Sequence, residues 1–308
     1  MRALAGEPDI AALSRALAGP SRGEVTPTSS ARQLDLALRR MAAAQMKLLV
    51  RWMGGRTAKL RVLLEDEDRR SLRALVRGAA AGVPAEARLA GLMPTPDLPE
   101  RALVLLASAA SPAQVGAALL AMGNAYGPAV LEEAGSTNAG LYATELAIGR
   151  LWAERSRRAV RRAGRELRRF VEDAIDVENS LAGLALVTNR EAVASGELFV
   201  PGGRRITPEV FGEVATSPDP RTAARRLLRR WQPARASGGA QPRSIERLLL
   251  GLRIRSMSRQ ALLRPSGPSP VLEWALRLRA QSMDLGAIVW SRALGASREQ
   301  IVDQLAGA

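Results

Sequence analysis

The sequence predicts an all-α protein, and three observations support that fold class. Aromatic residues make up only 3% of the 308 residues although hydrophobic residues make up 47%, and the apolar content is mostly Ala, Leu and Val, which suits closely packed helices better than pleated sheets. Apolar residues recur at helical spacing over long stretches. Pro, Gly and Ser gather between those stretches, where they end helices.

The helices are expected where the apolar stripes occur. Apolar or small residues recur every 3.6 residues over residues 34–53, 152–174, 221–231 and 245–263. The second of these stretches also carries a separate row of arginines: Arg155, Arg158, Arg162, Arg165 and Arg169. We therefore expect one amphipathic helix there, with a solvated arginine face.

Five segments rich in Pro, Gly and Ser are expected to connect the helices. They cover residues 19–30, 93–99, 199–208, 232–242 and 265–270. The third of them includes a Gly202-Gly203 turn.

Residues 102–131 form the one uncharged stretch that suggests a membrane span. Ser111 followed by Pro112 has the form of a helix N-cap with proline at the first helical position. Gln114, Asn124 and a further proline also interrupt the stretch. Two short buried helices are therefore expected there.

Glu7 and Asp9 interrupt the N-terminus, so no secretion signal is expected and the predicted location is cytoplasmic.

Histidine and cysteine are both absent from the chain. Their absence excludes disulfides, thiol nucleophiles and cysteine-bound zinc, and removes the usual general base at neutral pH and the commonest metal ligand. Gly54-Gly55-Arg56-Thr57 and Gly202-Gly203 lack the spacing and the lysine of a phosphate-binding loop. We expect no catalytic residues, no cofactor and no bound metal.

The chain has 45 Lys+Arg against 30 Asp+Glu, which gives a net charge of +15. Nearly all of the basic residues are arginines, since only Lys47 and Lys59 are lysines. One interpretation is a surface for nucleic acid or anionic membrane. The other is the composition of a GC-rich genome, since net charge by itself reports solubility and non-specific binding. The scarcity of Phe and Tyr leaves few side chains on which bases can stack, which favours the second interpretation.

A faint internal repeat runs through the sequence. An acid precedes a small polar residue by three positions at Asp68 and Ser71, and the same layout returns 108 residues later at Asp176 and Asn179. A weaker third copy contains Gln281 and Asp284. We therefore predict three helical units, which cover residues 1–96, 97–206 and 207–308.

Acidic residues cluster at 65–68 and 172–178. Such clusters suit Mg²⁺, which prefers oxygen ligands, but arginines at helical spacing favour ion-paired helix faces instead. Asp176 and Asn179 share one helical face where an apolar stripe begins, so both must be hydrogen-bonded if they are buried. Their expected role is to fix how one repeat packs on the next.

These residues resemble a known family, the C subunits of the A-type and bacterial V-type ATPases, whose eukaryotic counterparts are the d subunits of the V-ATPase. The family's repeats carry the pattern acid-x-x-Asn-Leu-x-x-x-x-Arg, and a Gly-Gly loop like residues 198–204 follows the second copy. The positions that carry the resemblance are Asp68, Ser71, Arg77, Asp176, Glu178, Asn179, Gln281 and Asp284. The likeness extends from about residue 34 to the end of the chain.

The chain departs from the family pattern at several positions. Ser71 stands where the family has Asn, and Ser180 stands where it has Leu. Gln281 and Asp284 replace the usual Glu and Asn, and the N-terminal unit looks shortened. These departures concern the contacts with partners more than the fold.

The resemblance implies a funnel of three helical lobes on the cytoplasmic face of a membrane proteolipid ring, with the tip of the central-stalk shaft in its mouth. It implies a peripheral, non-catalytic rotor subunit, present as one copy per complex, that transmits torque between shaft and ring during ion transport. No nucleic-acid partner is expected. The alternative hypothesis is an arginine-rich helical protein that binds nucleic acid through residues 155–169 and 221–230.

Overall fold

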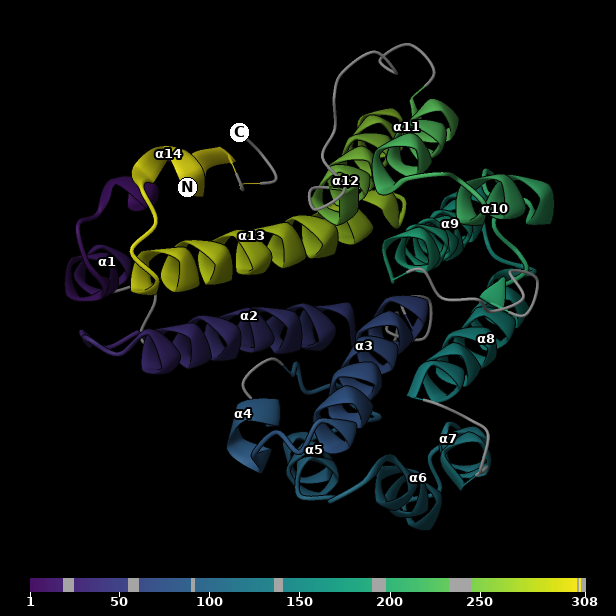
Figure 1. Cartoon of the computed structure of the whole chain (residues 1–308), viewed down its shortest axis with the longest axis horizontal. Helices are drawn as coiled ribbons and strands as arrows, with labels where there is room; N and C mark the ends of the chain where they lie inside the picture. The colour runs from purple at the N-terminus through teal and green to yellow at the C-terminus, as the bar shows by residue number, and fades with distance from the viewer. Residues whose placement is uncertain are drawn as a thin grey trace. The chain divides into compact units, whose positions relative to one another are not determined.

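The computed structural model describes residues 1–18, 25–54, 61–89, 92–135, 141–189, 198–232, 245–303 and 305. Every regular element in these ranges is a helix (Figure 1), which confirms the all-α prediction. The chain forms two compact units, the first comprising Met1–Ile148 and Arg277–Ala308 and the second Gly149–Leu276. The predicted division into three units at residues 97 and 207 stays a prediction.

The first unit contains most of the shorter helices. Its elements are η1 (Leu4–Gly6), α1 (Ile10–Leu17), α2 (Ala31–Met53), α3 (Arg61–Ala80), α4 (Ala85–Leu89), α5 (Glu100–Ala107), α6 (Pro112–Ala121), α7 (Gly127–Gly135), the start of α8 (Leu141–Val160), the end of α13 (Ser269–Ala293) and α14 (Arg298–Asp303). Helix α2 coincides closely with the stripe predicted over residues 34–53.

The two ends of the chain share one hydrophobic core. Leu13 of α1, Leu34 of α2 and Ile288 of α13 are buried in it together with Ile301 of α14. Polar contacts reinforce this packing, since Trp290 Nε1 donates to Asp35 Oδ2 at 3.2 Å. Residues of the C-terminal helices therefore complete the core of the N-terminal helices, and the purple and yellow elements lie next to one another in Figure 1.

The uncharged stretch forms three short helices, α5, α6 and α7, where two were expected. Ser111 caps α6 as predicted, because its side chain accepts from Gln114 N at 3.3 Å. The expected burial is only partly correct, since Val104 and Leu105 are 50% and 52% exposed. No helix in the described ranges combines the length and the apolar character needed to span a membrane.

Two glycines let α6 and α7 approach closely. A Cβ on Gly116 would lie 2.6 Å from Leu131 N, and one on Gly127 would collide with the backbone at Leu120. Since real Cβ atoms do not approach other atoms so closely, only glycine fits at these two positions. The two helices therefore pack backbone to backbone.

The second unit is built on long helices. It contains the end of α8, then α9 (Arg165–Asn189), α10 (Pro208–Ala215), α11 (Pro220–Trp231), α12 (Ile245–Leu263) and the start of α13. The helix expected over residues 152–174 is in fact two helices, because the chain turns at residues 161–164 between α8 and α9. Gly164 and a turn bond from Ala163 N to Val160 O, 3.0 Å long, mark the break, which the continuous apolar stripe concealed.

Aromatic side chains in the second unit are held by arginines. The guanidinium of Arg205 lies 4.5 Å from the centre of the Trp231 ring, and that of Arg253 lies 4.9 Å from the Phe170 ring. Trp231 Nε1 donates to Ser180 Oγ at 3.1 Å. Ser180, which replaces the Leu of the family pattern, therefore has a polar partner on α11.

Most expected connections lie where predicted. Residues 93–99 contain no helix, α10 begins at Pro208, the last residue of its expected connection, and α13 begins at Ser269, one residue before the end of its own. Of the connection expected at 19–30, residues 25–30 contain no helix and residues 19–24 lie outside the described residues, as do residues 233–242 of the connection expected at 232–242.

The short helices repeat in order along the chain. Helices α5 and α10 begin 108 residues apart, and so do α6 and α11. The caps correspond as well, because Ser111 and Asp219 each accept from a backbone N–H of the first turn and are each followed by proline. This correspondence agrees with the offset of the acidic motifs in the sequence.

Candidate functional site

Asp176 and Asn179 are fully buried on α9, and both hold the loop that leads to α10. Asp176 Oδ1 accepts from the backbone N–H groups of Arg204 at 2.9 Å, and of Arg205 and Ile206 at 3.0 Å. Three backbone donors on one carboxylate neutralise much of the cost of burying it. This side chain therefore attaches the backbone of the segment after Gly203 to α9.

Asn179 fixes the same loop at a second point. Its Nδ2 donates to Val200 O at 2.8 Å, and its Oδ1 accepts from Val200 N at 2.9 Å. The amide therefore pairs with a backbone residue as a neighbouring β-strand would. The requirement that a buried polar pair be hydrogen-bonded is met.

The Gly-Gly turn makes this approach possible. A Cβ on Gly203 would collide with Asp176 Oδ1, and Gly202 has φ +113°, a conformation that residues with a side chain rarely adopt. The pair expected to fix repeat against repeat therefore acts on a loop, and its contacts described above all lie inside the second unit.

Asp68 on α3 has a related contact in the first unit. Thr95 Oγ1 donates to Asp68 Oδ1 and accepts from Leu98 N at 3.0 Å. Leu98 directly precedes Pro99 and α5, as Ile206 precedes Thr207 and α10. Each of these aspartates thus holds the segment that leads into a short helix, directly in the second unit and through Thr95 in the first.

Burial shifts the pKa of both aspartates. Burial raises the pKa of Asp68 to about 7, and nearby Asp97 and Glu65 add to the increase while the Thr95 hydroxyl opposes it. Burial also raises the pKa of Asp176, against the backbone N–H donors and Arg205, which favour its charged form. Asp68 therefore exchanges its proton near neutral pH.

The other motif positions lie on α3, α9 and α13. Arg77 pairs with Glu145 in the first unit, with Nη2 and Oε2 2.6 Å apart. Ser71 is buried on α3 and Glu178 is half-buried on α9. On α13, Asp284 is buried and Gln281 is half-buried. Asp176 and Asn179 thus contact one loop, whereas the pair from the third copy of the repeat, Gln281 and Asp284, lies on α13.

The acidic clusters are ion-paired as expected, and each contains a buried aspartate. Asp66 is buried and lies 2.8 Å from Arg69 Nη2 and 2.6 Å from Arg70 Nη2. Asp173 is buried and pairs with Arg205. No three acidic side chains in the described ranges come together as a metal site would require.

Sequence reasoning missed Thr95 and the double role of Arg205. Thr95 lies between two prolines in an expected connection, so a hydroxyl that relays a hydrogen bond has no periodic signal there. Arg205 contacts Asp173 and Trp231 at once, which only the folded loop reveals.

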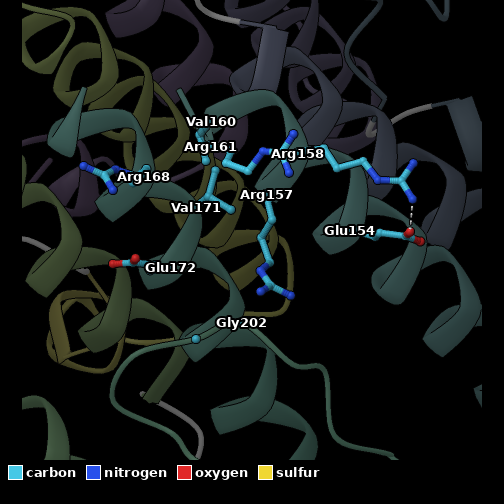
Figure 2. A pocket seen from close by; sticks show the side chains of 10 residues that line it. Glu154, Arg157, Arg158, Val160, Arg161, Arg168, Val171, Glu172 and Gly202 are labelled. Carbon is cyan, nitrogen blue, oxygen red and sulfur yellow. Dashed lines mark hydrogen bonds and ion pairs between the residues drawn. The ribbon is translucent and has the colours of Figure 1, made fainter. Parts of the chain in front are cut away.

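Arginines at the end of α8 and the start of α9 line a pocket of about 530 Å³ (Figure 2), and of the predicted arginine row only Arg158 is among them. Arg158 lies beside Glu154, with Nη2 and Oε1 2.5 Å apart, and Arg157 extends toward Gly202. The break between the two helices therefore gathers arginines at a corner, where a single straight helix would have spread them along one face.

The protein is an all-helical scaffold whose long helices hold the connecting loops through buried acidic residues. The polar residues described above stabilise this scaffold. Over residues 2–304 the chain matches the family model described as ATP synthase (C/AC39) subunit. The chain therefore belongs to this family, as the sequence resemblance implied. A search of curated proteins finds no match.

Proposed function

We propose that the protein is the non-catalytic rotor subunit of a V/A-type rotary ATPase that couples the central-stalk shaft to the membrane proteolipid ring. The observation that carries this proposal is the family match over residues 2–304. The proposed subunit is peripheral, lies on the cytoplasmic face of the ring and is present as one copy per complex.

Torque transmission requires a body that deforms little. Close-packed interiors have low compressibility and transmit strain. The backbone contact of α6 with α7 at Gly127 supports such stiffness, as do the loop contacts of Asp176 and Asn179. Fixing a connecting loop to a long helix removes a compliant link from the path of force.

Copurification tests the proposed assembly. Affinity-tagged protein is expressed in the organism that naturally produces it, and the membranes are solubilised in mild detergent. The proteins that copurify with the tag are identified by mass spectrometry. We expect the shaft subunits and the proteolipid to be recovered together with it. Recovery of a monomer free of both at low and at moderate salt would contradict the proposal.

Coupling is tested in membrane vesicles from cells that lack the protein. ATP hydrolysis and ion uptake are measured side by side, with and without added protein. We expect addition to restore ion uptake per ATP hydrolysed. If uptake is already normal without the protein, the proposed coupling role is wrong.

A further inference from the structure

The arginine pocket is formed by three separate segments of the second unit. Its walls come from the end of α8, the first turns of α9 and the Gly202-Gly203 turn (Figure 2). Buried Val160 and Val171 add an apolar part to the lining. The four arginines of the lining are Arg157, Arg158, Arg161 and Arg168.

The acidic side chains of the pocket do not neutralise these arginines. Glu154 forms an ion pair with Arg158. Glu172 Oε2 lies 3.9 Å from Nε of Arg204, a residue that does not belong to the pocket lining. The other three arginines of the pocket lining have no ion-pair partner among the residues that the structure describes. They are Arg157, Arg161 and Arg168. A concave site lined by excess positive charge concentrates anions.

The neighbourhood of the pocket adds further positive charge. Burial lowers the pKa of Arg169, and Arg204 and Arg165 lower it further, while Asp173 opposes them. Burial is the largest of these causes, and the neighbouring arginines add repulsion to it. An anion at this corner relieves that repulsion.

Gly202 positions Arg157 at the pocket. Any Cβ at residue 202 would collide with Arg157 Cδ, so the glycine leaves room for the arginine side chain to lie across the turn. Figure 2 shows this side chain extended toward Gly202. The turn that Asp176 and Asn179 anchor therefore also sets the place of one pocket arginine.

A second pocket of about 390 Å³ adjoins the first and shares Glu154 and Arg157 with it. Ala153, Phe199 and Pro201 give it an apolar lining. A ligand that is anionic at one end and carbon-rich at the other matches this pair of pockets.

We propose that the arginine pocket binds a phosphate-bearing ligand through Arg157, Arg161 and Arg168. Guanidinium groups bind phosphate oxygens in pairs of parallel hydrogen bonds, which makes arginine well suited to this anion. The phosphate comes either from a soluble phosphate compound or from the headgroup of an anionic phospholipid, whose carbon portion extends along Phe199. This inference does not depend on the proposed rotor function.

Binding is tested on the full-length protein with two probes. Pyrophosphate is titrated by calorimetry, and vesicles of phosphatidylcholine with about one-third phosphatidylglycerol are sedimented with the protein at low and physiological salt. The triple variant Arg157→Gln, Arg161→Gln, Arg168→Gln is compared with a control that removes the same charge from α11: Arg221→Gln, Arg225→Gln and Arg229→Gln.

We expect at least one probe to bind the wild type, and the pocket variant to bind it at least about tenfold more weakly, because hydrogen bonds between charged partners are strong. The α11 control is expected to bind as the wild type does. Pyrophosphate binding without vesicle binding identifies a soluble ligand, and the reverse identifies a lipid.

Two results overturn the proposal. One is equal loss of binding in both triple variants, which means that net charge alone is responsible. The other is a wild type that binds neither probe at low salt. Circular dichroism checks the fold, and the exposed single variant Arg161→Gln keeps the test available if the triple variant does not fold.

Discussion

Single buried polar side chains carry the loop geometry of this protein. Asn179 replaces two backbone hydrogen bonds that Val200 would make in a strand, and Asp176 collects three backbone donors. Removing one partner of a buried pair leaves the other unsatisfied, which costs more than the pair contributes. The loop before α10 therefore depends on two residues.

Asn179→Ala is expected to lower the free energy of unfolding by about 2–4 kcal/mol, because both polar groups of Val200 lose their partner. Urea unfolding followed by circular dichroism measures the change. Thr216→Ala is the control: its exposed hydroxyl donates to Gly212 O, and its removal is expected to cost within about 0.5 kcal/mol. Equal effects of the two changes would contradict the role of Asn179.

Asp68 is expected to make stability depend on pH. Because its pKa in the folded state is about 7 against a usual value of 3.8, the folded state binds the proton more tightly than the unfolded state. The free energy of unfolding therefore falls as the pH rises from about 4 to about 7. Asp68→Asn, which keeps the acceptor for Thr95, is expected to be more stable than the wild type above about pH 7.

Thermal unfolding between about pH 4 and pH 8 tests this expectation, since a smaller fall in Tm for Asp68→Asn across that range follows from the shifted titration. The control Asp303→Asn changes an exposed acid and is expected to follow the wild type. A curve for Asp68→Asn that is parallel to the wild type would show that Asp68 does not titrate in this range.

At the scale of elements, helix boundaries follow local signals where those signals are strong. Ser111 before Pro112 and Asp219 before Pro220 start helices by capping, which short-range sequence patterns reveal. The break between α8 and α9 has only Gly164 as its local signal, and the apolar stripe continues through it. Periodicity therefore predicted one helix where packing requires two.

Gly127→Ala is expected to lower the free energy of unfolding by about 1–3 kcal/mol, since the added methyl group meets the α6 backbone and the helices must separate. Gly212→Ala is the matched control inside α10, where an added Cβ meets nothing within 4 Å. This control is expected to stabilise the protein by about 0.5–1 kcal/mol. Chemical denaturation of both variants decides, and stabilisation by Gly127→Ala would rule out the backbone contact.

At the scale of the whole molecule, the chain ends are joined through one core. Ile301 of α14 is buried with residues of α1 and α2, although almost the whole sequence separates them. Residues that are buried in one core lose its protection together when that core opens, so we expect the two ends to behave as one cooperative element.

Ile301→Ala is expected to lower the free energy of unfolding by about 2–5 kcal/mol and to increase hydrogen exchange in α1 as well as in α14. Hydrogen exchange read by mass spectrometry reports both helices. Val302→Ala, at a half-buried neighbour, is expected to have a smaller effect. Faster exchange confined to α14 would show that the two ends are independent.

The all-helical class, several helix bounds and the family could be predicted from the sequence, because helical periodicity, capping residues and motif order are local properties of the chain. Local patterns also identified Asp176 and Asn179 as residues that need partners. Only the folded chain reveals which partners they have, why glycine stands at 203, and that α14 packs with the N-terminus. These features depend on close approach between segments far apart in sequence, and no local pattern encodes such distances.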